Sequence, residues 1–465
     1  MNTRKIAIVL IAFVLLGACP ITILRAADVP YFTITNSATL PTNAVIMSPP
    51  SAPPSPSGPS ILSSPAPAVS FQGLGDDNTR FPPDTDGCVG PNHVVTMLNT
   101  QVRVQNRTGT TNYSTTTLQS WWSDKFGFTV SPFDPRILYD PFSNRWIAIA
   151  AHFSPPSDSA ILIAASETSD PTGGWYPHGW DVDTNNTTFA DFPIVGFTQD
   201  KVVVTYNSLP LSGTDIDGVG IMVFNKTNLY NDTGEPQFIK QPYQSGSTVN
   251  GLGIAPVVSY NTNDPTMYLV QDFQDNSSGS GYLALYTITG SAGSAVLTRS
   301  TNFPSASAWA STGAGTDNFG PQLGLSTKIH TGDSRMSQAV YRNGSLWCAH
   351  TIYLPADNPT RSAVQWWQIS TNGSVLQNGR IDDSSGLNFY AYPSIAVNKF
   401  GDALIGYSRF STNQYASANY ALHTLDGLNG SVGSDYVFKS GEAPYWKIHI
   451  TETDGVITAR HGLIR

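Results

Sequence analysis

The sequence predicts an all-β fold, a β-propeller, from three observations. The composition is typical of a strand-rich and turn-rich protein, because 40 Gly and 33 Pro occur among 465 residues and only 12% of residues are charged. Residues 134–151 have the pattern of a strand, a tight turn and a second, more apolar strand. Weaker copies of this pattern recur along the chain, and no segment predicts a helix.

Six units of this kind can be recognised. The first pairs residues 93–98 with 101–105, and the second is the 134–151 stretch continued by 160–165. The later four begin with residues 191–197, 254–260, 335–341 and 392–398. Most units begin about 50 to 60 residues apart, which leaves room for four strands in each. This regular recurrence favours a propeller over the alternative, a pair of β-sandwiches.

The first 27 residues are typical of an export signal, with a basic start and an apolar run at residues 6–16. Two processing sites are open. Cleavage before Cys19, as in a bacterial lipoprotein, would leave that cysteine for a lipid anchor. Ordinary cleavage near residues 26–27 would discard it. Under both alternatives we expect the protein outside the cytoplasm, in the extracellular space or the cell envelope.

Residues 28–68 follow as a spacer rich in Pro and Ser, so the propeller domain is expected to span residues 69–465. Cys88 and Cys348 are the cysteines of that domain. Export permits a disulfide between them, and two free thiols are the alternative. The formal net charge of -9 argues against nucleic acid as a partner and against a membrane contact other than the lipid anchor. We expect a monomer.

The last residues, 447–465, lose the strand pattern. When Thr453 is written as ACC and suitable synonymous codons follow, the frame that starts at the last base of that codon translates as RWGDYSATWSDP. This string has the strand-and-turn character of another unit. The sequence therefore predicts a frame shift that leaves a seventh blade lost or truncated, and a natural divergent tail is the alternative. A propeller that cannot close would leave sheet faces and edges uncovered.

Five segments carry a family resemblance: FPPDTDGCVGPNHVV, DPRILYDPFSNRW, SETSDPTGGW, ADFPIVGF and YPSIAVNKFGDALIGYS. Together they resemble exported bacterial β-propeller-like proteins of unassigned activity, over residues 71–446. The chain departs from that family at Cys88, where a small residue is more usual, and in its tail, where an RWGDYS-type motif is usual. The turn at residues 168–175 also resembles the Asp-box of sialidase-type propellers. Both resemblances imply a fold rather than an activity.

In a propeller the first strand of each unit lines a central channel, so its first residues are expected to converge on one pocket. The candidate ligand-binding residues are Asp84, Asp86, His93, Asp134, Arg136, Asp191, Arg335 and Tyr392. Carboxylates, arginines and an aromatic ring of this kind could hold a sugar or a carboxylated ligand. The alternative is structural, because an aspartate in Asp-Pro or Asp-x-Asp-Gly commonly caps a turn.

Asp84 and Asp86 also offer hard oxygen donors that would suit a Ca²⁺ ion, although no complete calcium loop is present. No other cofactor is expected. The sequence holds no convincing fingerprint of a serine hydrolase, a zinc protease or a nucleotide-binding protein. His350 lies on an apolar strand and is expected to be a hydrogen-bonded core residue.

These observations predict an exported or cell-surface binding or scaffold module whose ligand is a glycan or a protein. The alternative is a polysaccharide-active enzyme, a glycoside hydrolase or a lyase, that uses the carboxylates of the central channel. Four glutamates in the whole chain are few for a glycosidase. The sequence does not decide whether the protein is an enzyme.

Overall fold

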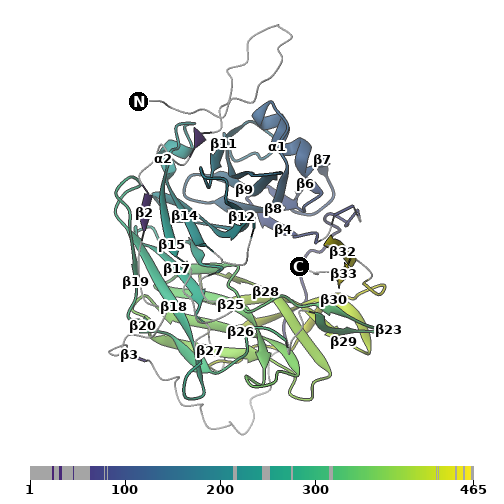
Figure 1. Cartoon of the computed structure of the whole chain (residues 1–465). Coiled ribbons are helices and arrows are strands. Elements are labelled where there is room, and N and C mark those ends of the chain that lie inside the picture. The colour runs from purple at the N-terminus through teal and green to yellow at the C-terminus, as the bar shows by residue number, and fades with distance from the viewer. Residues whose placement is uncertain are drawn as a thin grey trace.

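The computed structural model describes residues 63–445, apart from 78, 81, 213–216, 243–251, 274–275, 314–317, 426 and 428, and the backbone of short strands outside that range. This part of the chain is almost entirely β-structure (Figure 1). Within it, six runs of four consecutive strands form antiparallel sheets. Each unit recognised in the sequence overlaps one of these sheets.

The sheets are numbered in chain order. The first sheet consists of β4 (Asp86–Val89), β5 (His93–Met97), β6 (Gln101–Asn106) and β7 (Asn112–Thr117). The second consists of β8 (Pro132–Asp140), β9 (Arg145–Ser154), β10 (Asp158–Ser166) and β11 (Trp175–Asp181). The third consists of β12 (Thr188–Phe197), β13 (Lys201–Pro210), β14 (Gly218–Asn225) and β15 (Pro236–Pro242).

The fourth sheet consists of β16 (Ala255–Ser259), β17 (Met267–Asp272), β18 (Ser280–Thr289) and β19 (Val296–Arg299). The fifth consists of β24 (Ala339–Arg342), β25 (Ser345–Leu354), β26 (Arg361–Ser370) and β27 (Val375–Ile381). The sixth consists of β28 (Asn388–Val397), β29 (Ala403–Ser411), β30 (Gln414–His423) and β31 (Tyr436–Lys439).

Short strands complete the structure. Between the fourth and fifth sheets lie β20 (Asn302–Phe303), β21 (Ser305–Ser307) and the hairpin of β22 (Asn318–Gln322) and β23 (Leu325–His330). At the two ends of the chain lie β1 (Leu24–Arg25), β2 (Tyr31–Thr33), β3 (Val45–Ile46), β32 (Ile448–Thr453) and β33 (Val456–His461). The last two pair as an antiparallel hairpin.

Two short helices, α1 (Leu118–Phe126) and α2 (Lys226–Leu229), occur where the sequence predicts none. The Thr117 side chain caps the start of α1 by accepting a hydrogen bond from the backbone N–H of Ser120. Gly127, in the left-handed conformation with φ 73°, ends it. Trp122 is fully buried between α1 and the first two sheets. Tertiary packing of this aromatic side chain therefore stabilises a helix that local periodicity does not reveal.

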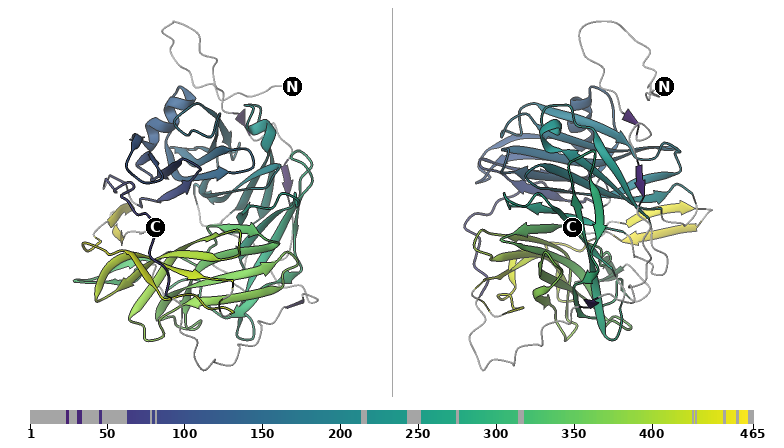
Figure 2. Two further views of the ribbon diagram at one scale, coloured as in Figure 1. Left: turned by 180° about the vertical axis from the view of Figure 1, so that it is seen from behind. Right: turned by 90° about the vertical axis from the view of Figure 1, so that its left-hand side faces the viewer.

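The sheets follow one another around a common centre (Figures 1 and 2). Residues on, or just before, the first strand of each sheet line the space at this centre. Three of these inner strands, β12, β16 and β24, are parallel neighbours, since Phe197 pairs with Val258 and Val257 with Ala339. Apolar cores fill the space between successive sheets. Strands such as β25 are therefore buried on both faces, which explains why their sequences are continuous apolar runs rather than alternating ones.

Several expectations fall outside the described residues. The export signal, its two cleavage sites, the lipid on Cys19 and most of the spacer lie before residue 63, and they stay predictions. The frame-shift hypothesis concerns residues 447–465, of which only the backbone of β32 and β33 is described, so it also stays a prediction. In the described part of the chain, no helix is long and apolar enough to span a bilayer.

Candidate functional site

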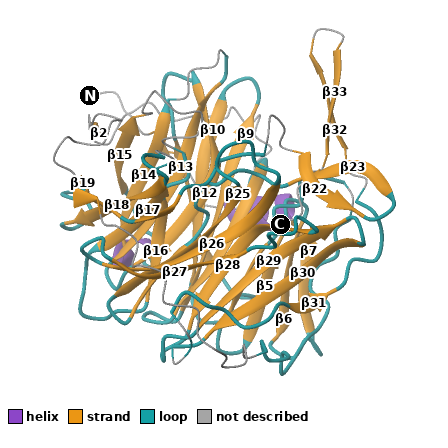
Figure 3. Ribbon diagram, turned by 90° about the horizontal axis from the view of Figure 1, so that it is seen from below, coloured by secondary structure: helices purple, strands orange, loops and turns teal. Residues whose placement is uncertain are grey.

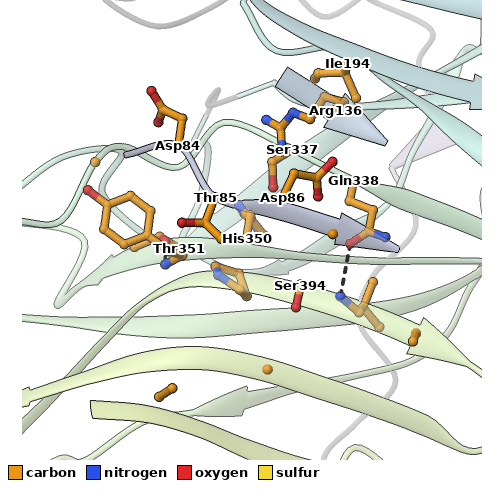
Figure 4. A pocket seen from close by; sticks show the side chains of 18 of the residues that line it. Asp84, Thr85, Asp86, Arg136, Ile194, Ser337, Gln338, His350, Thr351 and Ser394 are labelled. Carbon is orange, nitrogen blue, oxygen red and sulfur yellow. Dashed lines mark hydrogen bonds between the residues drawn. The ribbon is translucent and has the colours of Figure 1, made fainter. Parts of the chain in front are cut away.

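A cavity of about 1360 Å³ lies at the centre of the six sheets, and each sheet contributes residues to its wall. The loop between β23 and β24 supplies a further part of the wall. Figure 4 shows that Asp84, Asp86, Arg136 and Ser337 surround the same space, although they come from segments far apart in the sequence. The cavity is therefore the place where the inner strands present polar side chains together.

Seven of the eight candidate residues line this cavity, namely Asp84, Asp86, Asp134, Arg136, Asp191, Arg335 and Tyr392. Their role in ligand binding stays a prediction. His93 does not line it. The His93 side chain lies 3.8 Å from the Asp170 carboxylate and packs edge-on against Tyr113. The reason is the order of the strands. His93 begins β5, the second strand of the first sheet, whereas the inner strand of that sheet is the short β4.

A repeated bulge shapes the inner strands. Asp134, Phe192 and Tyr392 each have a left-handed backbone, with φ of 51°, 52° and 54°, and each precedes a proline. At each of these points the pairing with the second strand of the sheet shifts register. A non-glycine residue in this conformation is strained, and such bulges re-aim side chains near functional sites. In β8, β12 and β28 the bulge changes the direction of the strand at the point where it borders the cavity.

Hydrogen bonds between neighbouring sheets hold the three bulges. The backbone N–H of Asp134 donates to Asn99 Oδ1 at 2.7 Å, and that of Tyr392 donates to Thr351 Oγ1 at 3.0 Å. The N–H of Phe192 donates to Asp134 Oδ2 at 3.2 Å. In each pair the acceptor belongs to the preceding sheet. Asp134 thus links three successive sheets, and one of its carboxylate oxygens has a structural role.

A guanidinium and three carboxylates form the polar centre of the cavity. Asp333 accepts from Arg335 Nε at 2.8 Å through Oδ1 and from Arg335 Nη2 at 2.6 Å through Oδ2. Burial would lower the pKa of Arg335, but the charge of Asp333, with Asp191 and Asp134, raises it above its usual value. Arg335 is therefore a permanent cation whose position is fixed by carboxylates.

The phenyl ring of Phe192 lies between two guanidinium groups. Arg335 lies 5.1 Å and Arg136 lies 5.4 Å from the ring centroid. Arg136 also donates from Nε to the backbone carbonyl of Pro193 at 3.3 Å. These cation–π contacts help to hold both guanidinium groups at the cavity wall.

Two of the predicted aspartates also have structural partners. Asp84 Oδ2 accepts from Asn99 Nδ2 at 2.8 Å, and Asp86 Oδ2 accepts from the backbone N–H of Ile137 in the next sheet at 2.9 Å. Figure 4 shows the equivalent contact in the sixth sheet, where Gln338 accepts from the backbone N–H of Ile395. One oxygen of each aspartate thus has a structural partner, but these partners lie 15 and 51 residues away and are not the turn caps that the structural alternative expected.

The calcium site predicted at Asp84 and Asp86 gains no third carboxylate, histidine or cysteine in the part of the chain that the structure describes. Within the described ranges, no group of three or more His, Cys, Asp or Glu side chains is placed to hold a metal ion. One oxygen of each carboxylate is also engaged by a hydrogen-bond donor. Ca²⁺ binding at Asp84 and Asp86 therefore stays a prediction.

Of the two alternatives that the sequence leaves open for Cys88 and Cys348, the structure shows two free thiols and no disulfide between them. Cys88 lies on β4 in the first sheet, whereas Cys348 is buried on β25 within the core that joins the third, fourth and fifth sheets. Burial raises the pKa of Cys88 to about 12 and also raises that of Cys348. Each thiol thus packs as a small apolar side chain in its own core.

His350 is a buried, hydrogen-bonded residue, as the sequence predicts, and it also borders the cavity (Figure 4). It is fully buried, with Nδ1 3.0 Å from the Ser334 carbonyl oxygen and Nε2 accepting from Trp367 Nε1 at 3.2 Å. Burial lowers its pKa to about 3, so the imidazole is neutral at ordinary pH and Nδ1 carries the proton. The turn at residues 168–175 is likewise structural, because Asp170 accepts from the Thr172 backbone and hydroxyl.

In and beside the loop between β23 and β24, sequence reasoning found Arg335 but missed Asp333, Gln338 and His330. The loop brings Asp333 and Gln338 to the cavity wall, and His330, the last residue of β23, also borders the cavity. His330 Nδ1 accepts from the Gly332 N–H at 3.1 Å, and the Tyr392 hydroxyl donates to the His330 carbonyl at 3.0 Å. The available signal was the aspartate two residues before Arg335, since an Asx turn puts such a pair side by side.

Comparison with known proteins assigns no family. No protein-family model matches the chain, and no curated protein matches it. An apocarotenoid oxygenase of Synechocystis is 10% identical, with 77% of this chain and 72% of that chain covered and a TM-score of 0.42. An endo-arabinase of Bacteroides thetaiotaomicron is 11% identical, with 64% and 95% covered and a TM-score of 0.32. A glycosyl hydrolase of Bacteroides ovatus is 9% identical, with 65% and 88% covered and a TM-score of 0.31. Likeness at this level assigns neither an activity nor a ligand to this chain.

Proposed function

We propose that the six sheets are blades of a β-propeller and that its central cavity binds a carbohydrate outside the cytoplasm. The observation that carries the proposal is the convergence of Asp134, Asp191, Asp333, Arg136 and Arg335 on one cavity. A sugar hydroxyl both donates and accepts hydrogen bonds, so a wall that carries both carboxylates and guanidiniums can satisfy several hydroxyls of one ring.

The size and charge of the cavity narrow the choice of ligand. Its volume of about 1360 Å³ exceeds the roughly 300–1,000 Å³ of ordinary small-molecule sites, so an oligosaccharide is favoured over a single sugar. The wall carries five carboxylates, Asp84, Asp86, Asp134, Asp191 and Asp333, against three arginines, Arg80, Arg136 and Arg335. This balance disfavours polyanions. Because the polar groups lie inside a concavity, a glycan chain also fits better than a folded protein surface.

Arg335 offers a test with a matched control. Arg361 on β26 makes a similar two-bond contact with Asp382, at 2.7 Å for each bond, but does not line the cavity. We expect the full chain to bind at least one oligosaccharide on a glycan array and in calorimetry. Arg335→Gln should weaken that binding roughly 10- to 100-fold, the effect of losing hydrogen bonds to a charged group, whereas Arg361→Gln should not change it.

A second variant separates binding from folding. Arg335→Lys keeps the positive charge among the carboxylates but loses the planar two-bond geometry, so the melting temperature should stay near that of the parent while binding weakens. Equal affinity for the parent, Arg335→Gln and Arg335→Lys would refute the proposed site. Absence of binding across a broad glycan panel would refute the ligand class.

A polysaccharide-active enzyme is the second candidate, and the grouping of Asp134, Asp191 and Asp333 around Arg335 favours it. Paired carboxylates are the groups that cleave glycosidic bonds. Release of reducing sugar from a bound polysaccharide, abolished in Asp191→Asn while binding persists, would support hydrolysis. Unsaturated products that absorb in the ultraviolet would instead indicate a lyase. Binding without any product over long incubation would leave the binding module and exclude both activities for that polysaccharide.

A further inference from the structure

A row of four paired positions crosses the sixth sheet on the face that borders the central cavity. Ser394 on β28 pairs with Gly406 on β29. Tyr420 on β30 pairs with Gly406 on one side and with Tyr436 on β31 on the other. Figure 3 shows these four strands side by side. Because directly paired residues of an antiparallel sheet project to the same face, and Ser394, Gly406 and Tyr420 line the cavity, the row faces the cavity.

Among the described residues, no contact requires glycine at position 406. Its φ lies outside the left-handed region, and a Cβ built on it would first meet the Ser394 hydroxyl, at 3.1 Å, which can rotate away. At Gly196 on β12, by contrast, the same atom would lie 2.4 Å from the Val257 carbonyl oxygen. Glycine weakens the interior of a strand, and where close packing does not require it, it often marks a place where a ligand approaches the backbone. Gly406 therefore leaves room for a ligand above the sheet.

The Tyr420 ring is held on one face and at its hydroxyl. The Tyr436 ring stacks on it, with ring centroids 4.9 Å apart and an angle of 24° between the ring planes. The Tyr420 hydroxyl donates to the Pro65 carbonyl. On the other side its paired neighbour is Gly406, which has no side chain to cover the ring. The space above Gly406, between Tyr420 and Ser394, is called the slot, and its aromatic wall is fixed before any ligand binds.

Uncharged apolar side chains border the slot. Leu404 lies two residues before Gly406 on β29, so it projects to the same face, and it is 41% exposed. Phe438 is 47% exposed, and its ring centroid lies 6.4 Å from that of Tyr420. Both residues line the cavity. The slot therefore suits a ligand surface of C–H groups rather than an ionic group.

The slot also adjoins the polar part of the cavity. Ser394 precedes Ile395, whose backbone N–H donates to Gln338 at 3.3 Å (Figure 4). Gln338 belongs to the same loop as Asp333 and Arg335, and all three line the cavity. One elongated ligand can therefore contact the carboxylates and guanidiniums at one end and the slot at the other.

We propose that the slot is a sugar subsite in which a pyranose ring lies over Gly406 and stacks on Tyr420, and that the glycan of this cavity is a neutral, flat chain of β-linked pyranoses with equatorial hydroxyls. Such a ring presents axial C–H groups on its faces, which pack on the electron-rich face of an aromatic ring. Its hydroxyls lie at the edge of the ring, where the Ser394 hydroxyl can bond one of them. The inference rests on the proposed carbohydrate ligand and adds the kind of chain and the place of one ring.

Calorimetry on the full chain tests both parts of the inference. Cellohexaose is a flat, β-linked chain, whereas the α-linked chain of maltohexaose curves, so cellohexaose should bind roughly 10-fold more tightly. Gly406→Val fills the slot without changing a charge and should weaken the binding of cellohexaose roughly 10-fold, the effect of losing one stacked ring. Valine is favoured in strands, so the melting temperature should stay near that of the parent.

Variants of Tyr420 keep the test decisive if Gly406→Val does not fold. Tyr420→Leu removes the flat ring and should weaken binding about as much as Gly406→Val. Tyr420→Phe keeps the ring but not the bond to Pro65, so it should lose less affinity than Tyr420→Leu. Tyr113→Leu is the matched control and should bind like the parent, because Tyr113 on β7 is 50% exposed and does not line the cavity.

The results separate the subsite from the proposed function. Gly406→Val and Tyr420→Leu that bind as tightly as the parent, while Arg335→Gln binds more weakly, would overturn the subsite and leave the carbohydrate site intact. Equal losses in Tyr420→Phe and Tyr420→Leu would assign the effect to the Pro65 contact and also overturn stacking. Equal or tighter binding of maltohexaose, or a bound glycan when cellohexaose does not bind, would overturn the flat chain. A broad panel without any bound glycan would refute the proposed function, and the inference with it.

Discussion

Asp140 offers a quantitative test of how the second and third sheets are joined. It is fully buried, and its Oδ2 lies 3.0 Å from Lys226 Nζ. The same oxygen accepts from the Tyr230 hydroxyl at 2.8 Å, while Oδ1 accepts from the Phe142 N–H at 2.9 Å. Burial lowers the pKa of Lys226 even though Asp140 opposes that shift. The negative charge of Asp140 therefore stabilises the positive charge of Lys226, which is buried away from water.

Asp140→Asn keeps the size of the side chain but removes its charge. Loss of one partner from a buried ion pair costs roughly 3–5 kcal/mol. Because Lys226 can lose its proton instead of staying charged, we expect the lower end, about 3 kcal/mol in the free energy of unfolding. Urea unfolding followed by tryptophan fluorescence and by circular dichroism measures the change and checks that the two transitions coincide.

Asp200→Asn is the control for this measurement. Asp200 also pairs with a lysine, Lys201, at 2.7 Å, but the Asp200 side chain is 47% exposed. Lys201 is itself buried, at 3% exposure, but it keeps a second acceptor in the Pro265 carbonyl at 3.0 Å, and water screens the half-exposed Asp200 carboxylate, so Asp200→Asn should cost only about 1 kcal/mol. The reasoning is refuted if Asp140→Asn costs no more than Asp200→Asn. A double variant, Asp140→Asn with Lys226→Met, should recover part of the lost stability, because it removes the unpaired buried charge.

Three further results are expected. Asp134→Ala should lower the melting temperature by several degrees, because the strained Phe192 N–H loses its acceptor at a cost of about 1–3 kcal/mol, whereas Asp134→Asn should lower it less. Burial holds His350 neutral in the folded protein, with a pKa of about 3. Between about pH 6.5 and 3 the unfolded chain therefore binds one more proton at His350 than the folded chain, and the free energy of unfolding should fall as the pH falls. His350→Gln should make the free energy of unfolding less dependent on pH in this range. Gly196→Ala should destabilise strongly in a thermal melt, because the added Cβ would lie 2.4 Å from the Val257 carbonyl oxygen and force β12 away from β16; an unchanged melting temperature would contradict that packing.

The positions of the strands could be predicted because their turns are chemically marked. In the turn between β8 and β9, Asp140 Oδ1 accepts from the Phe142 N–H, and Asn144 adopts φ 54°. Aspartate and asparagine favour these geometries by local hydrogen bonding and tolerance of a left-handed backbone. His93 was assigned wrongly because β4 has only four residues, which is too short for alternation to distinguish the inner strand from the next one.

The remaining part of the site depends on contacts that sequence patterns do not encode. Asp333 lies in a loop without periodicity, and the fold alone brings it to the cavity with residues from other sheets. The ring of Phe192 between Arg136 and Arg335 likewise joins residues from three segments. A single sequence shows that such residues exist, but their convergence follows from how the sheets are arranged around the centre.

The bulges connect the stability of the ring to the aim of its polar side chains. Asp134 both accepts the Phe192 N–H and faces Arg335, so a substitution there changes the backbone and the charge of the cavity together. A loss of ligand binding in Asp134→Ala would therefore not distinguish a contact from a displaced strand. Arg335 does not hold a bulge in the same way. The Arg335 side chain is held by Asp333, which lies in the same loop. Substitution of Arg335 therefore tests ligand binding in the cavity more directly, whereas substitution of Asp134 tests the contacts that hold successive sheets together.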